Sequence, residues 1–329
     1  MVMEALSQVR ERPDLWTPQS KNRLSPREKI NDTVIDLMLN VGPQLSALVD
    51  QGHGRQAIGS VVGRDEDEEI QIDEDAERLV VSALEASAKK NKLGFRVLSE
   101  HGNYLIGKNP QFYAHFDPFD NSDEQQKGLD TPPHVTGAFY DLAGSPIAAM
   151  DINLFTLHAF VVRNDKLYEY NLKTGDAQEL SLPPEITTIK DPRFVIASYF
   201  GRDKYSRKFN SYLDEVNKQR ADKSTFHPKA GTHLYPYMAK GAVSAYAMFD
   251  EPYGEIFPGL PFALAAGFKV WSVNNDGTHE DVKFDPELQH KSVPFYLVVR
   301  TEELGEELIQ IAMKAKKEKD LLDWGVTTV

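Results

Sequence analysis

Residues 114–122 read Ala-His-Phe-Asp-Pro-Phe-Asp-Asn-Ser, and the rest of the chain can be interpreted outward from them. The apolar residues that lead up to Phe116 predict a buried strand. Asp117 and Asp120 follow, with a proline between them that cannot continue a ladder, so we expect the strand to stop and turn there. A turn that displays two carboxylates and the backbone carbonyl between them forms an all-oxygen pocket suited to Mg²⁺.

Asn121 and Ser122 lead from this turn into the polar segment 123–126, which predicts the start of a helix. Backbone N–H groups at such a start can bind a phosphate. The pattern therefore predicts a metal ion together with a phosphate. The alternative is a solvated, Asp-rich surface turn without any ligand.

The composition is that of an ordinary globular protein: 329 residues, 41% hydrophobic and 26% charged. No apolar run approaches the roughly 20 residues that span a bilayer, and the first 18 residues lack the apolar core of a secretion signal. A net charge of −13 disfavours nucleic acid as a partner. Because the chain has no cysteine, a metal must be bound by oxygen or imidazole. We therefore expect a cytoplasmic protein that contacts neither nucleic acid nor membrane.

Residues 1–25 show little periodicity and predict a loose N-terminal arm. Ser25-Pro-Arg-Glu28 has the pattern of a capping box, which predicts a helix that begins at residue 26 and breaks near Gly42-Pro43. The acidic run 65–69 predicts the turn of a hairpin, with a solvated turn favoured over a metal site.

Three predicted strands end in acids. Ile70-Gln-Ile72 precedes Asp73, which also starts a strong helix; 95–99 precedes Glu100; and the strand of the opening motif precedes Asp117. Because functional sites gather where strand ends meet loops, we expect these acids to converge.

Alternating patterns over 134–170 predict further sheet, and prolines at 183–192 punctuate a boundary. We predict an N-terminal α+β half over 26–190 that carries the carboxylates, and a C-terminal α/β half over 191–329 that contributes substrate contacts and one metal ligand. In the second half we expect a strand at 194–199, a helix at 205–218 and a single element of unassigned type at 234–247. A helix at 258–266, strands at 269–273 and 294–300, and a terminal helix at 301–322 follow.

The order of motifs resembles the inositol monophosphatase and fructose-1,6-bisphosphatase superfamily. The matching pieces lie between residues 55 and 285 and are Asp73-x-x-x-Glu77, Ser99-Glu100, Asp117-Pro-Phe-Asp-Asn-Ser122, Gly231-Thr232, Ala245-Tyr246, and Glu255 followed by Ala266-Gly267. The resemblance implies a layered αβαβα sandwich. It also implies a Mg²⁺-dependent phosphomonoester hydrolase with two or three ions, acting on a small phosphorylated metabolite such as a sugar phosphate or bisphosphate. Members of this superfamily usually form homodimers or homotetramers, so the resemblance also implies one of these assemblies.

By the same resemblance, one ion would be bound by Glu100, Asp117 and the Phe119 carbonyl, and a second by Asp117, Asp120 and Glu255. Asp73 and the Ser122 hydroxyl would position a metal-activated water for in-line attack. Phosphate and substrate would meet Asn121, Ser122, Gly231, Thr232 and His233.

Four positions depart from the family pattern. Asn121 replaces a glycine and is the residue type that next best tolerates φ > 0. Glu255 replaces an aspartate, and His101 stands where a second glutamate is frequent. Met248 occupies the place of a glutamate that binds inositol hydroxyls, which disfavours inositol phosphate. The segment 125–134 is expected to be a loop near the site, and the candidate anion contacts are Lys127, Arg202, Lys204, Lys229, His233 and Lys240.

These departures leave a second hypothesis open, namely a catalytically impaired member that binds metal or a phosphorylated ligand and acts as a regulatory protein. A phosphatase that works through an aspartyl-phosphate is disfavoured, because this chain has Asp-x-x-Asp rather than Asp-x-Asp.

Overall fold

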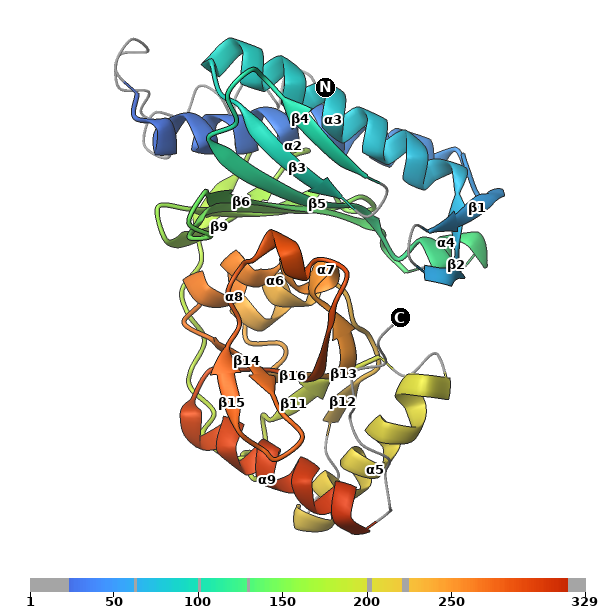
Figure 1. The fold of residues 1–329 in the computed structure, drawn as a ribbon, viewed down its shortest axis with the longest axis vertical. Coiled ribbons are helices and arrows are strands. Elements are labelled where there is room, and N and C mark those ends of the chain that lie inside the picture. Colours follow the sequence, from blue (N-terminus) through green and yellow to red (C-terminus); the bar gives the residue numbers. More distant parts are fainter. Residues whose placement is uncertain are drawn as a thin grey trace. The chain divides into compact units, whose positions relative to one another are not determined.

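The computed structural model describes residues 24–61, 64–99, 102–128, 131–199, 203–220 and 225–318 (Figure 1). The chain divides into two compact units. The first comprises Met1–Leu180 with Phe257–Pro261, and the second comprises Ser181–Ile256 with Phe262–Val329. The units change over at 180–181, whereas the sequence analysis placed the domain boundary at 190–191. No helix among the described residues is both long and apolar enough to cross a bilayer.

The described part of the first unit contains an eight-stranded sheet, antiparallel except where β3 and β5 run parallel. Its strands in spatial order are β10 (Ala177–Glu179), β9 (Lys166–Asn171), β8 (His158–Arg163), β7 (Pro146–Asn153), β6 (His134–Asp141), β5 (Phe112–Asp120), β3 (Phe95–Ser99) and β4 (Asn103–Ile106). The strands predicted over 134–170 are confirmed. Helices α2 (Pro26–Asp50) and α3 (Gln71–Asn91) pack on one face of this sheet (Figure 1).

The start of α2 follows the predicted capping box: the Ser25 hydroxyl accepts from the Glu28 N–H, and the Glu28 carboxylate accepts from the Ser25 N–H. The predicted break near Gly42-Pro43 is wrong, because α2 continues through Pro43. Buried residues on both sides of the proline, such as Val41 and Leu45, pack into the same core. Tertiary packing thus outweighs the one hydrogen bond that proline cannot make.

A separate hairpin pairs β1 (Ala57–Val61) with β2 (Arg64–Ile70). The acidic run 65–69 lies in β2 itself, so the predicted acidic turn is wrong. The predicted strand Ile70-Gln-Ile72 is wrong as well, since α3 begins at Gln71. Two apolar residues separated by one polar residue fit both the end of a strand and the first turn of a helix. In this structure the segment from Gln71 onward is helical.

The described part of the second unit contains a six-stranded mixed sheet. Its order is β12 (Thr225–His227), β11 (Val195–Ala197), β13 (Ala245–Pro252), β16 (Ser292–Val299), β14 (Lys269–Val273) and β15 (His279–Asp281). Helices α5 (Asp203–Gln219) and α9 (Glu302–Glu318) pack against each other and against the sheet. The shorter helices are α4 (Ser122–Gln126) in the first unit, α6 (Leu234–Ala239), α7 (Tyr253–Ile256) and η2 (Pro286–Leu288) in the second, and α8 (Leu260–Ala265), across which the chain passes from one unit to the other.

The single element predicted over 234–247 is wrong, because a helix and a strand, α6 and β13, share that range. Alternate residues of β13 serve two faces. Ala245, Ala247 and Phe249 join the core with α5 and α9, while the Tyr246 ring packs edge-on against Tyr235 of α6. Helices therefore cover both faces of this sheet.

Gly137 on β6 pairs with Phe116 on β5, and the Phe116 ring fills the space that a side chain at 137 would need. An added Cβ would lie 2.3 Å from a Phe116 ring carbon. We expect Gly137→Ala to lower the free energy of unfolding by roughly 2 kcal/mol through overpacking. Adding Phe116→Leu should return part of that loss in urea denaturation, whereas strictly additive losses would contradict the proposed contact.

Glu215 on α5 is buried and accepts hydrogen bonds from Lys314 of α9 and, at 2.9 Å, from Lys218. Burial by itself would raise the pKa of this carboxyl, but the donors from Lys314, Lys218 and Gln219 outweigh it and lower the pKa to about 2. Since the folded pKa lies below the ordinary value, the stabilisation is present above pH ~4.5 and is lost as the pH falls toward 2.

We expect Glu215→Gln to destabilise the protein by roughly 2 kcal/mol at pH 6. The difference in unfolding free energy between wild type and variant should shrink as the pH falls from about 4.5 to about 2.5. Denaturant titrations of both proteins across this range test it, and a pH-independent difference would contradict the ion cluster.

Candidate active site

The two carboxylates of the opening motif lie at the end of β5. Asp117 faces Thr136 of β6, and Asp120 faces His134. Pro118 and Phe119 of β5 therefore stand opposite the single residue Val135 of β6. This two-against-one arrangement is a β-bulge. The expectation that the strand stops at the proline is wrong, since the ladder resumes at Asp120 after the bulge.

The bulge decides where these side chains point. In a regular strand, residues three apart point to opposite faces. The extra residue in the bulge cancels this offset, so Asp117 and Asp120 share the sheet face of Thr136 and His134. Asp117 is buried and its Oδ1 accepts from the Phe119 N–H at 3.3 Å, while Asp120 is half-buried.

The turn after β5 has the backbone that the sequence analysis expected. Asn121 has φ +75°, the left-handed region, and α4 begins at Ser122. The Asn121 side-chain N–H donates to the Pro132 carbonyl at 3.2 Å, and that of Gln125 donates to the Thr131 carbonyl at 2.6 Å. Side-chain amides of the turn and of α4 thus hydrogen-bond to backbone carbonyls in the described part of the predicted 125–134 loop.

Asp73 lies in the first turn of α3 rather than at a strand end. It is 4% exposed, and its Oδ2 accepts from the Ile70 N–H at 2.9 Å, so it caps the helix. One turn later the buried Glu77 accepts a hydrogen bond from Ser99 at the end of β3. Because Ser99 pairs with Phe116, this end of α3 is linked to the strand that carries Asp117.

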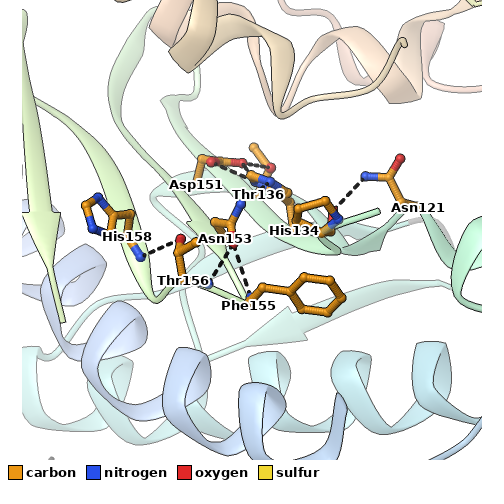
Figure 2. Close-up of polar contacts among 9 residues, drawn as sticks. Asn121, His134, Thr136, Asp151, Asn153, Phe155, Thr156 and His158 are labelled. Carbon is orange, nitrogen blue, oxygen red and sulfur yellow. Dashed lines mark hydrogen bonds and ion pairs between the residues drawn. The ribbon is translucent and has the colours of Figure 1, made fainter. Parts of the chain in front are cut away.

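A second polar group, which the sequence analysis missed, lies on the sheet face that the register assigns to the carboxylates, and Figure 2 shows its members. His134 and Thr136 of β6 meet Asp151 and Asn153 of β7, and all four are at most 5% exposed. The available signal was the alternation His-Val-Thr and Asp-Ile-Asn within otherwise apolar strands, which we interpreted only as sheet.

The second unit holds the remaining predicted contacts. Gly231 has φ +117°, and Thr232 and His233 are buried just before α6. Burial lowers the pKa of His227 on β12, and the neighbouring residues His233 and Lys229 lower it further.

Glu255 and Met248 also belong to the second unit. Glu255 is half-buried in the short helix α7. Met248 is buried, and its sulfur accepts from the Tyr199 N–H at 3.2 Å and from the Ser198 hydroxyl at 3.4 Å. The Met248 side chain is therefore engaged at the end of β11.

In the first unit, Glu77 of α3 contacts Ser99 of β3, which pairs with the strand that carries Asp117, and Asp120, Asn121 and Ser122 follow Asp117 in sequence. Within the described ranges, no three acidic or imidazole side chains form a group that could hold a metal ion. Of the predicted site and anion contacts, Glu100, His101 and Arg202 lie outside those ranges. The complete predicted ligand set stays a prediction.

Solved structures with the same architecture identify the fold. An inositol monophosphatase from Thermotoga maritima is similar with a TM-score of 0.64 at 13% identity, covering 88% of this chain and 99% of that one. The extragenic suppressor protein SuhB from Bartonella henselae gives 0.62 at 17% identity, covering 85% and 98%. A calcium-bound protein of the inositol monophosphatase family from Staphylococcus aureus gives 0.63 at 12% identity, covering 88% and 96%.

No protein-family model matches the chain, and no curated protein matches its sequence. The chain has the α/β fold of the inositol monophosphatase family. The resemblance deduced from the motifs is confirmed at the level of the fold.

The backbone at Asn121 can be tested by substitution. Because φ is +75°, Asn121→Ala should lower the free energy of unfolding by about 1 kcal/mol more than Asn121→Gly, although both lose the hydrogen bond to Pro132. Urea denaturation of the two variants measures the difference. An alanine variant as stable as the glycine variant would contradict the left-handed conformation.

Proposed function

We propose that this protein is a Mg²⁺-dependent phosphomonoester hydrolase that acts on a small phosphorylated metabolite, with a sugar phosphate or bisphosphate as the favoured class. The observation that carries the proposal is the bulge of β5, which presents Asp117 and Asp120 on one sheet face directly before the Asn121-Ser122 turn. This arrangement occurs in a chain with the inositol monophosphatase fold.

The residues at this turn fit a hard divalent cation. Asp117 and Asp120 offer only oxygen donors, and Mg²⁺ and Ca²⁺ prefer such ligands. With the Phe119 carbonyl, Glu100 and Glu255, they would hold two or three ions. When bound, the cations would lower the pKa of a water molecule and neutralise charge on the leaving oxygen. The calcium in the Staphylococcus aureus family protein supports a divalent cation.

The chain's own groups would orient the reactants. The Asp73 carboxylate, held by the Ile70 N–H, and the Ser122 hydroxyl would align the attacking water. Backbone N–H groups of Asn121 and Ser122 would bind the phosphate. Such prearranged donors account for much of the catalysis in phosphoryl transfer, because they need no reorganisation during the reaction.

Gly231, Thr232 and His233 would contact the rest of the substrate. The engaged sulfur of Met248 is a weak acceptor and is poorly suited to polyol hydroxyls, so inositol phosphates are disfavoured. A cytoplasmic location and a homodimer or homotetramer complete the proposal.

A second candidate is a binding or regulatory protein without turnover. The observation that favours it is Asn121, whose side chain reaches from the turn to Pro132 at a position where glycine would leave room for a phosphate.

A phosphatase panel with Mg²⁺ distinguishes the two candidates, with bisphosphorylated sugars, nucleotide 3′-phosphates and inositol phosphates as substrates. We expect turnover of at least one sugar phosphate, and Asp117→Asn should lower kcat at least about a hundredfold because it weakens the cation site. The exposed Asp165 on another turn provides the control Asp165→Asn, which should retain full activity. Ligand binding without hydrolysis across the panel would reject the enzyme and support the second candidate.

A further inference from the structure

The polar group on β6 and β7 is aligned with the proposed cation ligands. Thr136 is the partner of both Asp117 on one side and Asp151 on the other, and His134 is likewise the partner of Asp120 and Asn153. Directly opposed residues of antiparallel strands have Cβ atoms about 5 Å apart on the same face. The two carboxylates of β5 therefore lie next to the two polar side chains of β6.

Asp151 is the centre of the polar group and is fully buried. Its carboxylate accepts from the Thr136 hydroxyl at 2.8 Å and from His134 Nδ1 at 3.0 Å (Figure 2). The Asp151 carboxylate thus hydrogen-bonds to both Thr136 and His134, the two residues that pair with the proposed cation ligands.

Asn153 determines the tautomer of His134. Its side-chain oxygen accepts from the backbone N–H groups of Phe155 at 3.1 Å and Thr156 at 2.9 Å. The amide nitrogen must then be the atom that donates to His134 Nε2, at 3.1 Å. His134 accordingly carries its proton on Nδ1 and donates it to Asp151.

Keeping this polar group inside the sheet costs free energy of folding. Burying polar side chains costs free energy that their hydrogen bonds offset only in part, and apolar side chains of similar volume would fill the same space without that cost. The group is therefore a candidate for a role beyond filling space.

We propose that Asp151 and His134 are positioning residues, which hold Thr136 and the imidazole against Asp117 and Asp120 and thereby maintain the affinity of these carboxylates for a divalent cation. This inference rests on the proposed function. Groups that orient metal ligands from behind typically contribute 10–100-fold to metal affinity.

The test is Mn²⁺ binding measured by isothermal titration calorimetry on the whole protein, with thermal unfolding measured in parallel. The double variant His134→Phe/Asp151→Leu replaces the hydrogen-bonded pair by apolar groups and is expected to remain folded. We expect it to bind Mn²⁺ roughly tenfold more weakly than the wild type. His134→Asn, whose amide can replace the Nδ1 donor, should bind more tightly than the double variant.

The sheet provides a matched control. His158 Nδ1 lies 3.3 Å from Glu169 Oε1 on the neighbouring strands β8 and β9, away from β5. His158→Phe/Glu169→Leu makes the same replacement there and should leave Mn²⁺ affinity unchanged.

A folded His134→Phe/Asp151→Leu variant that binds Mn²⁺ as tightly as the wild type would overturn this inference and leave the proposed function intact. A wild-type protein that binds no Mn²⁺ would overturn both. If the double variant does not fold, Asp151→Asn takes its place, with the same expected weakening and the same criterion for rejection.

Discussion

Pro118 has no N–H to donate, so the pairing of β5 with β6 cannot run on unchanged through this position. The sheet responds by a bulge, in which Pro118 and Phe119 stand opposite Val135. The consequence is geometric: Asp117 and Asp120, three residues apart, face the same side. Without the bulge one of them would point into the core beneath α2 and α3. The candidate site therefore depends on how one proline is accommodated.

The surroundings of the bulge are built to hold it in place. Phe116 covers Gly137 on the helix side, and its ring packs edge-on against Phe139. On the other face, the Phe257–Pro261 segment belongs to the same unit: Tyr140 donates to the Phe257 carbonyl, and the Phe257 ring packs against His115. Strands β5 and β6 thus present apolar side chains to the helices on one face and the polar side chains of the candidate site on the other, since the side chains of a strand alternate between faces.

Several assignments could not have been made from local pattern. The acidic run 65–69 suggested a turn, yet it pairs with β1, because pairing depends on the partner strand as well as on the run itself. Asp73 looked like the end of a strand and instead caps α3. The pair of Asp151 and His134 is 17 residues apart in sequence and is brought together only by the β6–β7 register. Polar residues in an apolar strand give no sign of their partners until that register is known.

The sequence by itself determined the α/β class, the order of motifs that led to the fold family, the capping box of α2, and the positive φ at Asn121. These features depend on periodicity, hydrogen-bonding capacity and backbone sterics within a few residues, which a single chain displays directly. The tertiary structure decided which face each acid occupies, which strands join across the bulge, and which buried polar groups pair. Those outcomes depend on register and on packing between segments far apart in the chain, and a shift of one residue in register would reverse them.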